Sequence, residues 1–113
     1  MAEESRASAV GGRRSVVLGV DGGGSRTRAR LADAQGQMLS TGEAGGSNPQ
    51  AVGMAGATRE ILLAIEHAFQ AARLASQPIA AACLGIAGVG RPGEREELER
   101  WAKEAKLYGD SEA

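Results

Sequence analysis

Residue types that suit phosphate binding gather in one short segment of the sequence, DGGGSRT at positions 21–27. Successive glycines allow several backbone N–H groups to turn towards one anion, and serine, threonine and arginine side chains add further donors. The aspartate could hold a hydrated Mg²⁺ that bridges phosphates. Phosphoryl transfer depends on this kind of positioning and charge neutralisation. The segment therefore predicts phosphate contacts from Gly22, Gly23, Gly24, Ser25, Arg26 and Thr27, with Asp21 holding Mg²⁺ through water.

Two widespread phosphate motifs do not describe this segment. A Walker A loop requires a lysine after its last glycine, where this chain has Ser25, and the dinucleotide pattern G-x-G-x-x-G requires a glycine where it has Thr27. Both motifs also continue into a helix, whereas residues 26–31 alternate in polarity like a strand. The candidate is thus a loop between two strands, and the alternative is a plain glycine turn without a ligand.

Two further glycine-containing loops could face the same ligand. In AGGSNP, at positions 44–49, Asn48 could hydrogen-bond to a polyol hydroxyl, although the residues by themselves favour a helix cap formed by Ser47 or Asn48. In GVGRPG, at positions 88–93, the G-x-G-x-x-G pattern matches, but its proline removes a donor near the expected pyrophosphate. A glycine-lined floor for a substrate at Gly88, or a simple connection between a strand and a helix, fits this segment better.

The pattern of apolar residues predicts the strands that position the first two loops. Residues 15–20 form a short, β-branched apolar run, and residues 26–31 alternate with a period of two that places arginines on one face. Residues 37–41 can return as a third strand after a turn. Three consecutive strands joined by short loops indicate an antiparallel meander.

The second half of the chain predicts a helix, a strand and another helix. Apolar residues recur at helical spacing over residues 52–76, most regularly from Gly56 on. Residues 79–86 form an apolar run of strand length, which a helical crossover could place as a buried parallel strand. A last helix is expected from near Pro92 to about Lys106. The predicted order is β-β-β-α-β-α, and the fold class is α/β with a mixed sheet.

Composition narrows the class of protein. The 113 residues include 17 glycines and only 3% aromatic residues, so the core would be thin, which suggests part of a larger unit. A hydrophobic fraction of 42% argues against general disorder, and a net charge of −1 argues against a nucleic-acid partner. The single cysteine, Cys83, lies in an apolar run and is expected to be buried, whereas His67 is expected at the surface or the edge of the helix's apolar stripe.

Nothing in the first part of the chain resembles a targeting signal. Residues 1–14 lack the apolar segment of a signal peptide, and no run approaches the ~20 apolar residues of a membrane span. We therefore expect a disordered tail over residues 1–14, a cytoplasmic location and no membrane partner.

Three segments, in this order, resemble one protein family. VLGVDGGGSRT, at positions 17–27, closely resembles the first phosphate motif of the BadF/BadG/BcrA/BcrD ATPase family, which includes N-acetylglucosamine kinases. GGSN, at positions 45–48, is similar to that family's second loop, and LGIAGVGRPGER, at positions 84–95, is similar to its strand-to-helix segment. The resemblance covers about residues 15–105, with Ser25 at a position where threonine is commoner.

The resemblance implies a fold and roles for individual residues. The family has the actin-like, ribonuclease-H-like ATPase fold, in which two lobes close over ATP and each lobe begins β-β-β-α-β-α. Residues 15–113 would then form a truncated, partial N-terminal lobe. The resemblance also implies that Asn48 touches sugar hydroxyls rather than only capping a helix, with Ser47 and Gly88 beside it. The implied ligands of the ATP phosphates are Gly23, Gly24, Ser25 and Thr27, and Asp21 would help to organise Mg²⁺.

The resemblance further implies an enzyme class. We expect the N-terminal part of an ATP-dependent kinase for N-acetylglucosamine or glucosamine, which uses ATP and Mg²⁺ and could form a homodimer at full length. Two alternatives stay open, namely an ATPase activator of a 2-hydroxyacyl-CoA dehydratase and a non-catalytic sugar-binding module. The catalytic aspartate of such kinases would lie beyond Ala113, so the chain alone is expected to have little activity.

Overall fold

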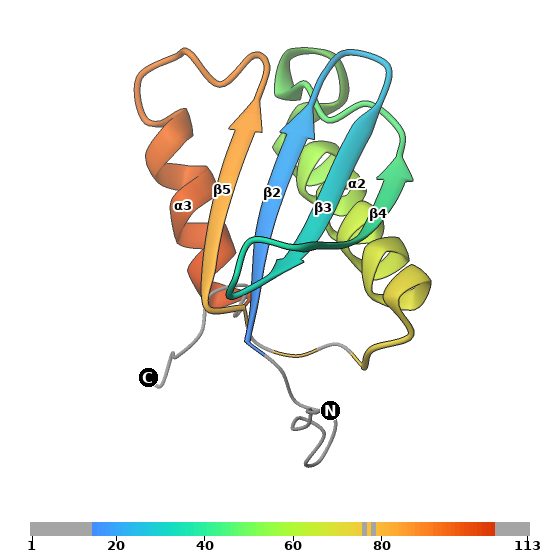
Figure 1. Cartoon of the computed structure of the whole chain (residues 1–113). Helices are drawn as coiled ribbons and strands as arrows, with labels where there is room; N and C mark the ends of the chain where they lie inside the picture. The colour runs from blue at the N-terminus through green and yellow to red at the C-terminus, as the bar shows by residue number, and fades with distance from the viewer. Residues whose placement is uncertain (1–14, 76, 78, 106–113) are drawn as a thin grey trace, which may run out of the picture.

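The computed structural model describes residues 15–75, 77 and 79–105, and within them the predicted elements follow one another in the predicted order. The elements are the strands β2 (Val16–Gly22), β3 (Thr27–Asp33), β4 (Met38–Ala44) and β5 (Ala81–Ile86) and the helices α2 (Pro49–Ala72) and α3 (Glu94–Glu104) (Figure 1). The α/β class and the β-β-β-α-β-α order are thus confirmed. The tail predicted over residues 1–14 and the helix end predicted at Lys106 lie outside the described residues.

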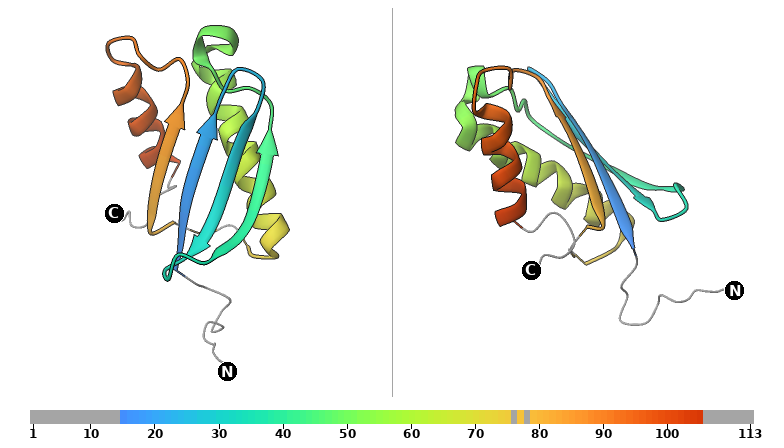
Figure 2. Two further views of the ribbon diagram at one scale, coloured as in Figure 1. Left: turned by 45° about the horizontal axis from the view of Figure 1, so that its top comes forward. Right: turned by 90° about the vertical axis from the view of Figure 1, so that its left-hand side faces the viewer.

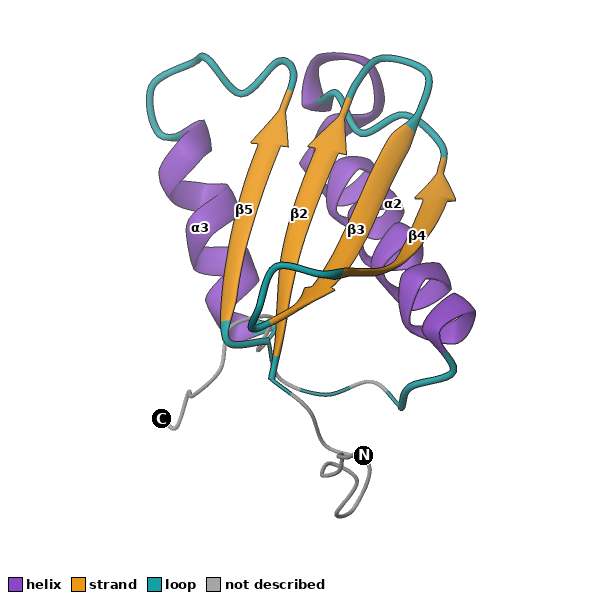
Figure 3. Cartoon of the chain, viewed as in Figure 1, coloured by secondary structure: helices purple, strands orange, loops and turns teal. Residues whose placement is uncertain are grey.

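The four strands form one mixed sheet in the order β4-β3-β2-β5. β2 pairs antiparallel with β3, and β3 pairs antiparallel with β4, which confirms the predicted meander. After the α2 crossover, β5 pairs parallel with β2. Because β2, β4 and β5 point the same way, the loops that follow them gather at one edge of the sheet (Figure 3). All three glycine-containing loops therefore lie at that edge.

Alternation along the strands buries only one face of the sheet. In β2, Val16, Leu18 and Val20 are buried, while the residues between them are more exposed. Both helices cover the buried face, as the side view in Figure 2 shows. The helical side chains buried in the same core are Ile61, Ala64, Ile65, Ala68 and Phe69 of α2 and Leu98 and Ala102 of α3. The core is thus a single layer between the sheet and two helices.

The opposite face of the sheet is exposed along β5, and this overturns one prediction. Cys83 is exposed there, so the expectation that it is buried was wrong. The apolar run over residues 79–86 suggested a strand buried on both sides, but burial alternates along β5 because the described helices pack on one side only. No helix in the described part of the chain combines the length and the apolar character needed to cross a membrane.

Small residues allow α2 to lie directly against β4. A Cβ atom on Gly42 would collide with the backbone nitrogen of Ala68, so the helix and the strand approach as closely as their backbones permit. The Ser40 hydroxyl donates to the Ala68 carbonyl oxygen at 2.6 Å. His67 is exposed, as predicted, and its Nδ1 lies 2.7 Å from the Glu43 carbonyl oxygen. Close approach thus compensates for the shortage of large side chains.

Capping signals predict the start of α2 better than apolar periodicity does. α2 starts at Pro49, as the predicted cap requires, and not at position 52, where the periodicity begins; Asn48 forms the cap by accepting a hydrogen bond of 2.9 Å from Gln50 N at its Oδ1. Gly53 then interrupts the helix with φ 76° and ψ 163°, which explains why regular periodicity is visible only further along. α3 starts at Glu94 instead of near position 92, because Gly93, with φ 87°, occupies the cap.

Candidate functional site

The segment predicted to bind phosphate forms the turn between β2 and β3. Gly22 pairs with Thr27 across the strands, and Gly23 N donates to the Arg26 carbonyl oxygen at 2.8 Å, which closes the turn. Beside the turn lies a surface hollow of about 270 Å³, lined by Asp21, Gly23, Gly24, Ser25, Arg26 and Arg28. The structure thus brings most of the predicted residues together around one hollow.

Two predicted residues, Gly22 and Thr27, lie beneath this turn. Thr27 is fully buried, and its hydroxyl donates to the Gly45 carbonyl oxygen at 2.7 Å and shares a second hydrogen bond of 2.7 Å with the Ser47 hydroxyl. Ser47 is also fully buried, and a Cβ atom on Gly22 would collide with its Oγ. These residues form a floor under the turn, which we define as Gly22, Thr27, Gly46 and Ser47. Their predicted contacts with phosphate or sugar stay predictions.

Unusual backbone angles do not explain the glycines of the turn, and close approach to neighbouring atoms explains only Gly22. Gly22, Gly23 and Gly24 all lie outside the left-handed region, and the Gly23 N–H is used within the turn. A Cβ atom on Gly46 would collide with the Gly24 carbonyl oxygen, and Ser47 N donates to the Gly23 carbonyl oxygen at 3.0 Å. A Cβ atom on Gly24 itself would meet nothing within 4 Å. The turn is therefore packed closely against Gly46 and Ser47, whereas the space next to Gly24 is open.

Charged side chains form a row across the exposed face of the sheet next to the turn. In the strand register, Asp21 lies opposite Arg28, and Arg28 lies opposite Glu43. Both Nε and one terminal nitrogen of Arg28 lie 3.0 Å from Glu43 Oε2, and Arg26 lies 3.8 Å from the same oxygen. Arg28 lines the hollow but was missed as a site residue. The alternation of arginines over residues 26–31 was the signal that could have found it.

Asp21 is the residue of the hollow that could contact a metal ion. The described residues contain no group of three or more His, Cys, Asp and Glu side chains that could hold a metal by themselves. Mg²⁺ commonly takes one or two carboxylates from the protein and completes its shell with phosphate oxygens and water. The exposed carboxylate of Asp21 therefore fits a Mg²⁺ that arrives with phosphates.

The second and third loops meet beside the floor. Asn48 follows β4, and Gly88 follows β5 with φ 86°; a Cβ atom on Gly88 would collide with the Asn48 side chain. Ala87 N donates to the Gly22 carbonyl oxygen at 2.8 Å, which ties the third loop to the first. The cap formed by Asn48 is confirmed, and the sugar contact implied by the resemblance stays a prediction. The structure therefore brings all three predicted segments to one place.

Comparison with known proteins identifies the family. The sequence matches the model of the BadF/BadG/BcrA/BcrD ATPase family over residues 18–113. The chain belongs to this family. Among solved structures it is similar to a protein from Chromobacterium violaceum that is provisionally named an N-acetylglucosamine kinase, with 36% sequence identity and a TM-score of 0.66. No protein with a curated description matches the chain.

The chain matches only part of the length of the Chromobacterium violaceum protein. The structural match covers 79% of this chain but 31% of the Chromobacterium violaceum protein. Together, the family match and the mixed four-stranded sheet confirm the N-terminal lobe of an actin-like ATPase. Membership of an ATPase family implies that the nucleotide is ATP.

Proposed function

We propose that the chain supplies the phosphate-binding turn, and one wall of the sugar site, of an ATP-dependent kinase for N-acetylglucosamine or glucosamine. The observation that carries the proposal is the hollow of about 270 Å³ beside the turn, which gathers a carboxylate, a hydroxyl and two guanidinium groups around two glycines. The family supports ATP as the nucleotide, and the name of the Chromobacterium violaceum protein supports an amino sugar.

On the phosphate side, each exposed residue has a distinct role. Arg26 and Arg28 neutralise phosphate charge, and the Ser25 hydroxyl donates a hydrogen bond to a phosphate oxygen. Gly24 leaves space for the ligand, because nothing lies within 4 Å of the position that its Cβ would take. Asp21 would hold Mg²⁺ through water, and the ion would supply further charge neutralisation.

On the sugar side, Asn48 is the proposed contact. Its Oδ1 is used as the cap of α2, so its side-chain NH₂ group serves as the donor to a sugar hydroxyl. Gly88 is the second proposed residue of the sugar site, and its lack of a side chain accommodates Asn48, because a Cβ atom there would collide with the Asn48 amide. Ser47 is fully buried and bonded to Thr27, so we assign it to holding Asn48 in place.

The test is a measurement of binding, since the match spans 31% of the Chromobacterium violaceum protein. Calorimetric titration with Mg·ATP should detect binding, and Arg26→Gln should weaken it about tenfold, as expected when a charged hydrogen bond is lost. Arg30→Gln is the matched control, because Arg30 is an exposed arginine of β3 that does not line the hollow. Equal losses in the two variants, or no binding of Mg·ATP at all, would contradict the phosphate site.

A second titration separates the sugar from the nucleotide. N-acetylglucosamine should bind, and Asn48→Ser should weaken its binding while retaining a side chain that can cap α2. Binding of Mg·ATP without binding of any amino sugar would contradict the sugar kinase and leave the dehydratase activator as the better interpretation.

A further inference from the structure

A small polar network joins the start of α2 to the loop between β5 and α3. Gln50 Nε2 donates to the Gly88 carbonyl oxygen at 3.0 Å and to Glu94 Oε2 at 2.8 Å. Glu94 Oε1 accepts from Arg91 N at 2.9 Å. Both partners of Gln50 Nε2 are acceptors, so only one orientation of the amide is compatible with the network. The network therefore bridges two separate loops through one side chain.

The same residue also fixes Asn48. The backbone N–H of Gln50 donates to Asn48 Oδ1, while its side chain holds the Gly88 carbonyl oxygen. Asn48 and Gly88 are packed so closely that a Cβ atom on Gly88 would collide with the Asn48 amide. Gln50 thus connects these two residues through two hydrogen bonds, one to Asn48 Oδ1 and one to the Gly88 carbonyl oxygen.

We propose that Gln50 and Glu94 form a latch that holds the loop at residues 87–93 against the start of α2 and so positions Asn48 and Gly88 for a hydroxyl-bearing ligand. The identity of that ligand, an amino sugar, rests on the proposed function, whereas the latch itself does not. Gln50 and Glu94 are positioning residues, because their polar atoms bind each other and the loop backbone. The bond to the Glu94 carboxylate is charge-assisted and therefore stronger than a neutral one.

Exchange of donor and acceptor provides the sharpest variants. Gln50→Glu places a carboxylate against the Gly88 carbonyl oxygen and the Glu94 carboxylate, so the latch should open. The double variant Gln50→Glu/Glu94→Gln restores a hydrogen bond between the two positions with opposite polarity, so it should close partly. Gln50→Ala removes the donor without adding repulsion, and it replaces Gln50→Glu if that variant does not fold.

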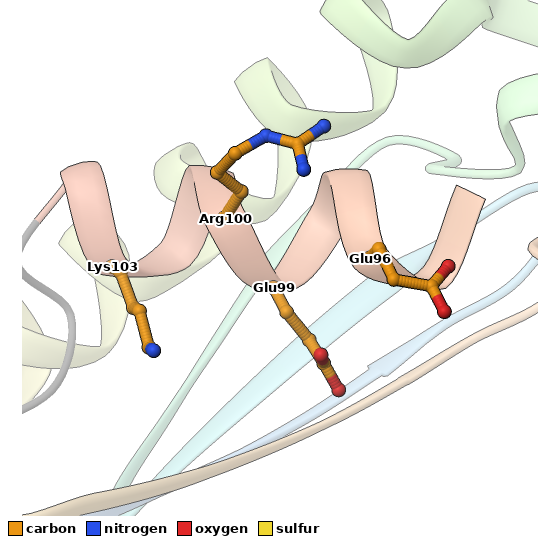
Figure 4. A pocket seen from close by; sticks show the side chains of 4 residues that line it. All are labelled: Glu96, Glu99, Arg100 and Lys103. Atoms are coloured by element: carbon orange, nitrogen blue, oxygen red, sulfur yellow. The ribbon is translucent and has the colours of Figure 1, made fainter. Parts of the chain in front are cut away.

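The matched control is Glu96→Gln. It removes one negative charge from the first turn of α3, as Glu94→Gln does, and so controls for the helix dipole. Glu96 does not belong to the latch; it lines a separate hollow of about 390 Å³ on α3 (Figure 4). The other residues lining that hollow are Glu99, Arg100 and Lys103.

The latch is tested first by amide hydrogen exchange, measured by NMR on the ¹⁵N-labelled chain. Gln50→Glu should speed exchange at the amides of residues 87–91 and 93 about tenfold, as expected for the loss of a charged hydrogen bond. The double variant should recover part of the protection, and Glu96→Gln should match the wild type. Wild-type exchange rates in both Gln50→Glu and Gln50→Ala would overturn the latch.

Ligand titrations then test positioning. Gln50→Glu should weaken binding of N-acetylglucosamine about tenfold and change binding of Mg·ATP less than about twofold, with partial recovery in the double variant. Faster exchange with unchanged sugar affinity would overturn the positioning role. If the wild-type chain binds Mg·ATP but no amino sugar, both the proposed sugar site and the positioning role are contradicted. The exchange rates then decide by themselves whether the latch exists.

Discussion

The turn between β2 and β3 and the floor beneath it share residues of the segment at positions 21–27 but have opposite environments. In the turn, Ser25 is exposed and Gly24 has free space above it. In the floor, Thr27 and Ser47 are fully buried, and Gly46 lies against the Gly24 backbone. Adjacent residues of one motif therefore divide into those that a ligand can reach and those that hold the reachable ones in place.

We expect the largest effect on stability from adding a side chain at Gly46 in the floor. Gly46→Val should lower the free energy of unfolding by about 3 kcal/mol, because its side chain must displace the backbone of Gly24. Gly24→Ala is the control on the turn, and it should change stability by less than about 1 kcal/mol. Urea denaturation of both variants measures the difference. Similar losses in the two variants would show that the turn and the floor are packed alike.

Removal of a buried hydroxyl should have the next largest effect. Thr27→Val leaves the Gly45 carbonyl oxygen and the Ser47 hydroxyl without this partner, so the free energy of unfolding should fall by about 2 kcal/mol. Thr27→Ser retains the hydroxyl and should lose less. Mg·ATP affinity of the folded Thr27→Val variant should be nearly unchanged. A large loss of affinity without a loss of stability would show instead that Thr27 contacts phosphate directly.

Ser25 tests the exposed turn in the way that Thr27 tests the buried floor. Ser25→Ala removes an exposed hydroxyl that lines the hollow, so stability should change by less than about 0.5 kcal/mol. Mg·ATP affinity should fall about tenfold, because the lost hydrogen bond is to a charged phosphate oxygen. Calorimetry and urea denaturation on the same sample separate the two quantities. A variant that loses stability and keeps its affinity would show that Ser25 has a structural role like that of the floor residues.

The smallest expected effect concerns the charged row beside the turn. Glu43→Gln weakens an exposed ion pair with Arg28, so the free energy of unfolding should change by less than about 1 kcal/mol. Mg·ATP affinity should rise about twofold, because a negative charge near the phosphates is removed. The gain should disappear at about 1 M salt, where charges are screened over roughly 3 Å. A loss of affinity would mean that Glu43 orients Arg28 for the ligand.

The sequence was sufficient for the element order, because glycines mark the loops and apolar periodicity marks the helices and strands between them. It was not sufficient to predict which side chains are buried. Cys83 lies in an apolar run, and no local pattern reveals that the described helices pack on one face of its strand. The phosphate contact of Thr27 stays a prediction, but the sequence did not reveal that its hydroxyl bonds to Gly45 and Ser47, which come from a different loop. Which hydroxyl is buried therefore depends on tertiary contacts.

The interruption of α2 at Gly53 separates two parts of the helix that have different contacts. Because Gly53 adopts φ 76° and ψ 163°, residues 49–52 form a separate first turn, while the long remainder of the helix carries Ala68 against β4. The first turn contains Gln50, whose side chain binds the Gly88 carbonyl oxygen in the loop after β5. The kink at Gly53 thus divides one helix between two tasks: its first turn contacts the loop after β5, and its remainder packs against β4.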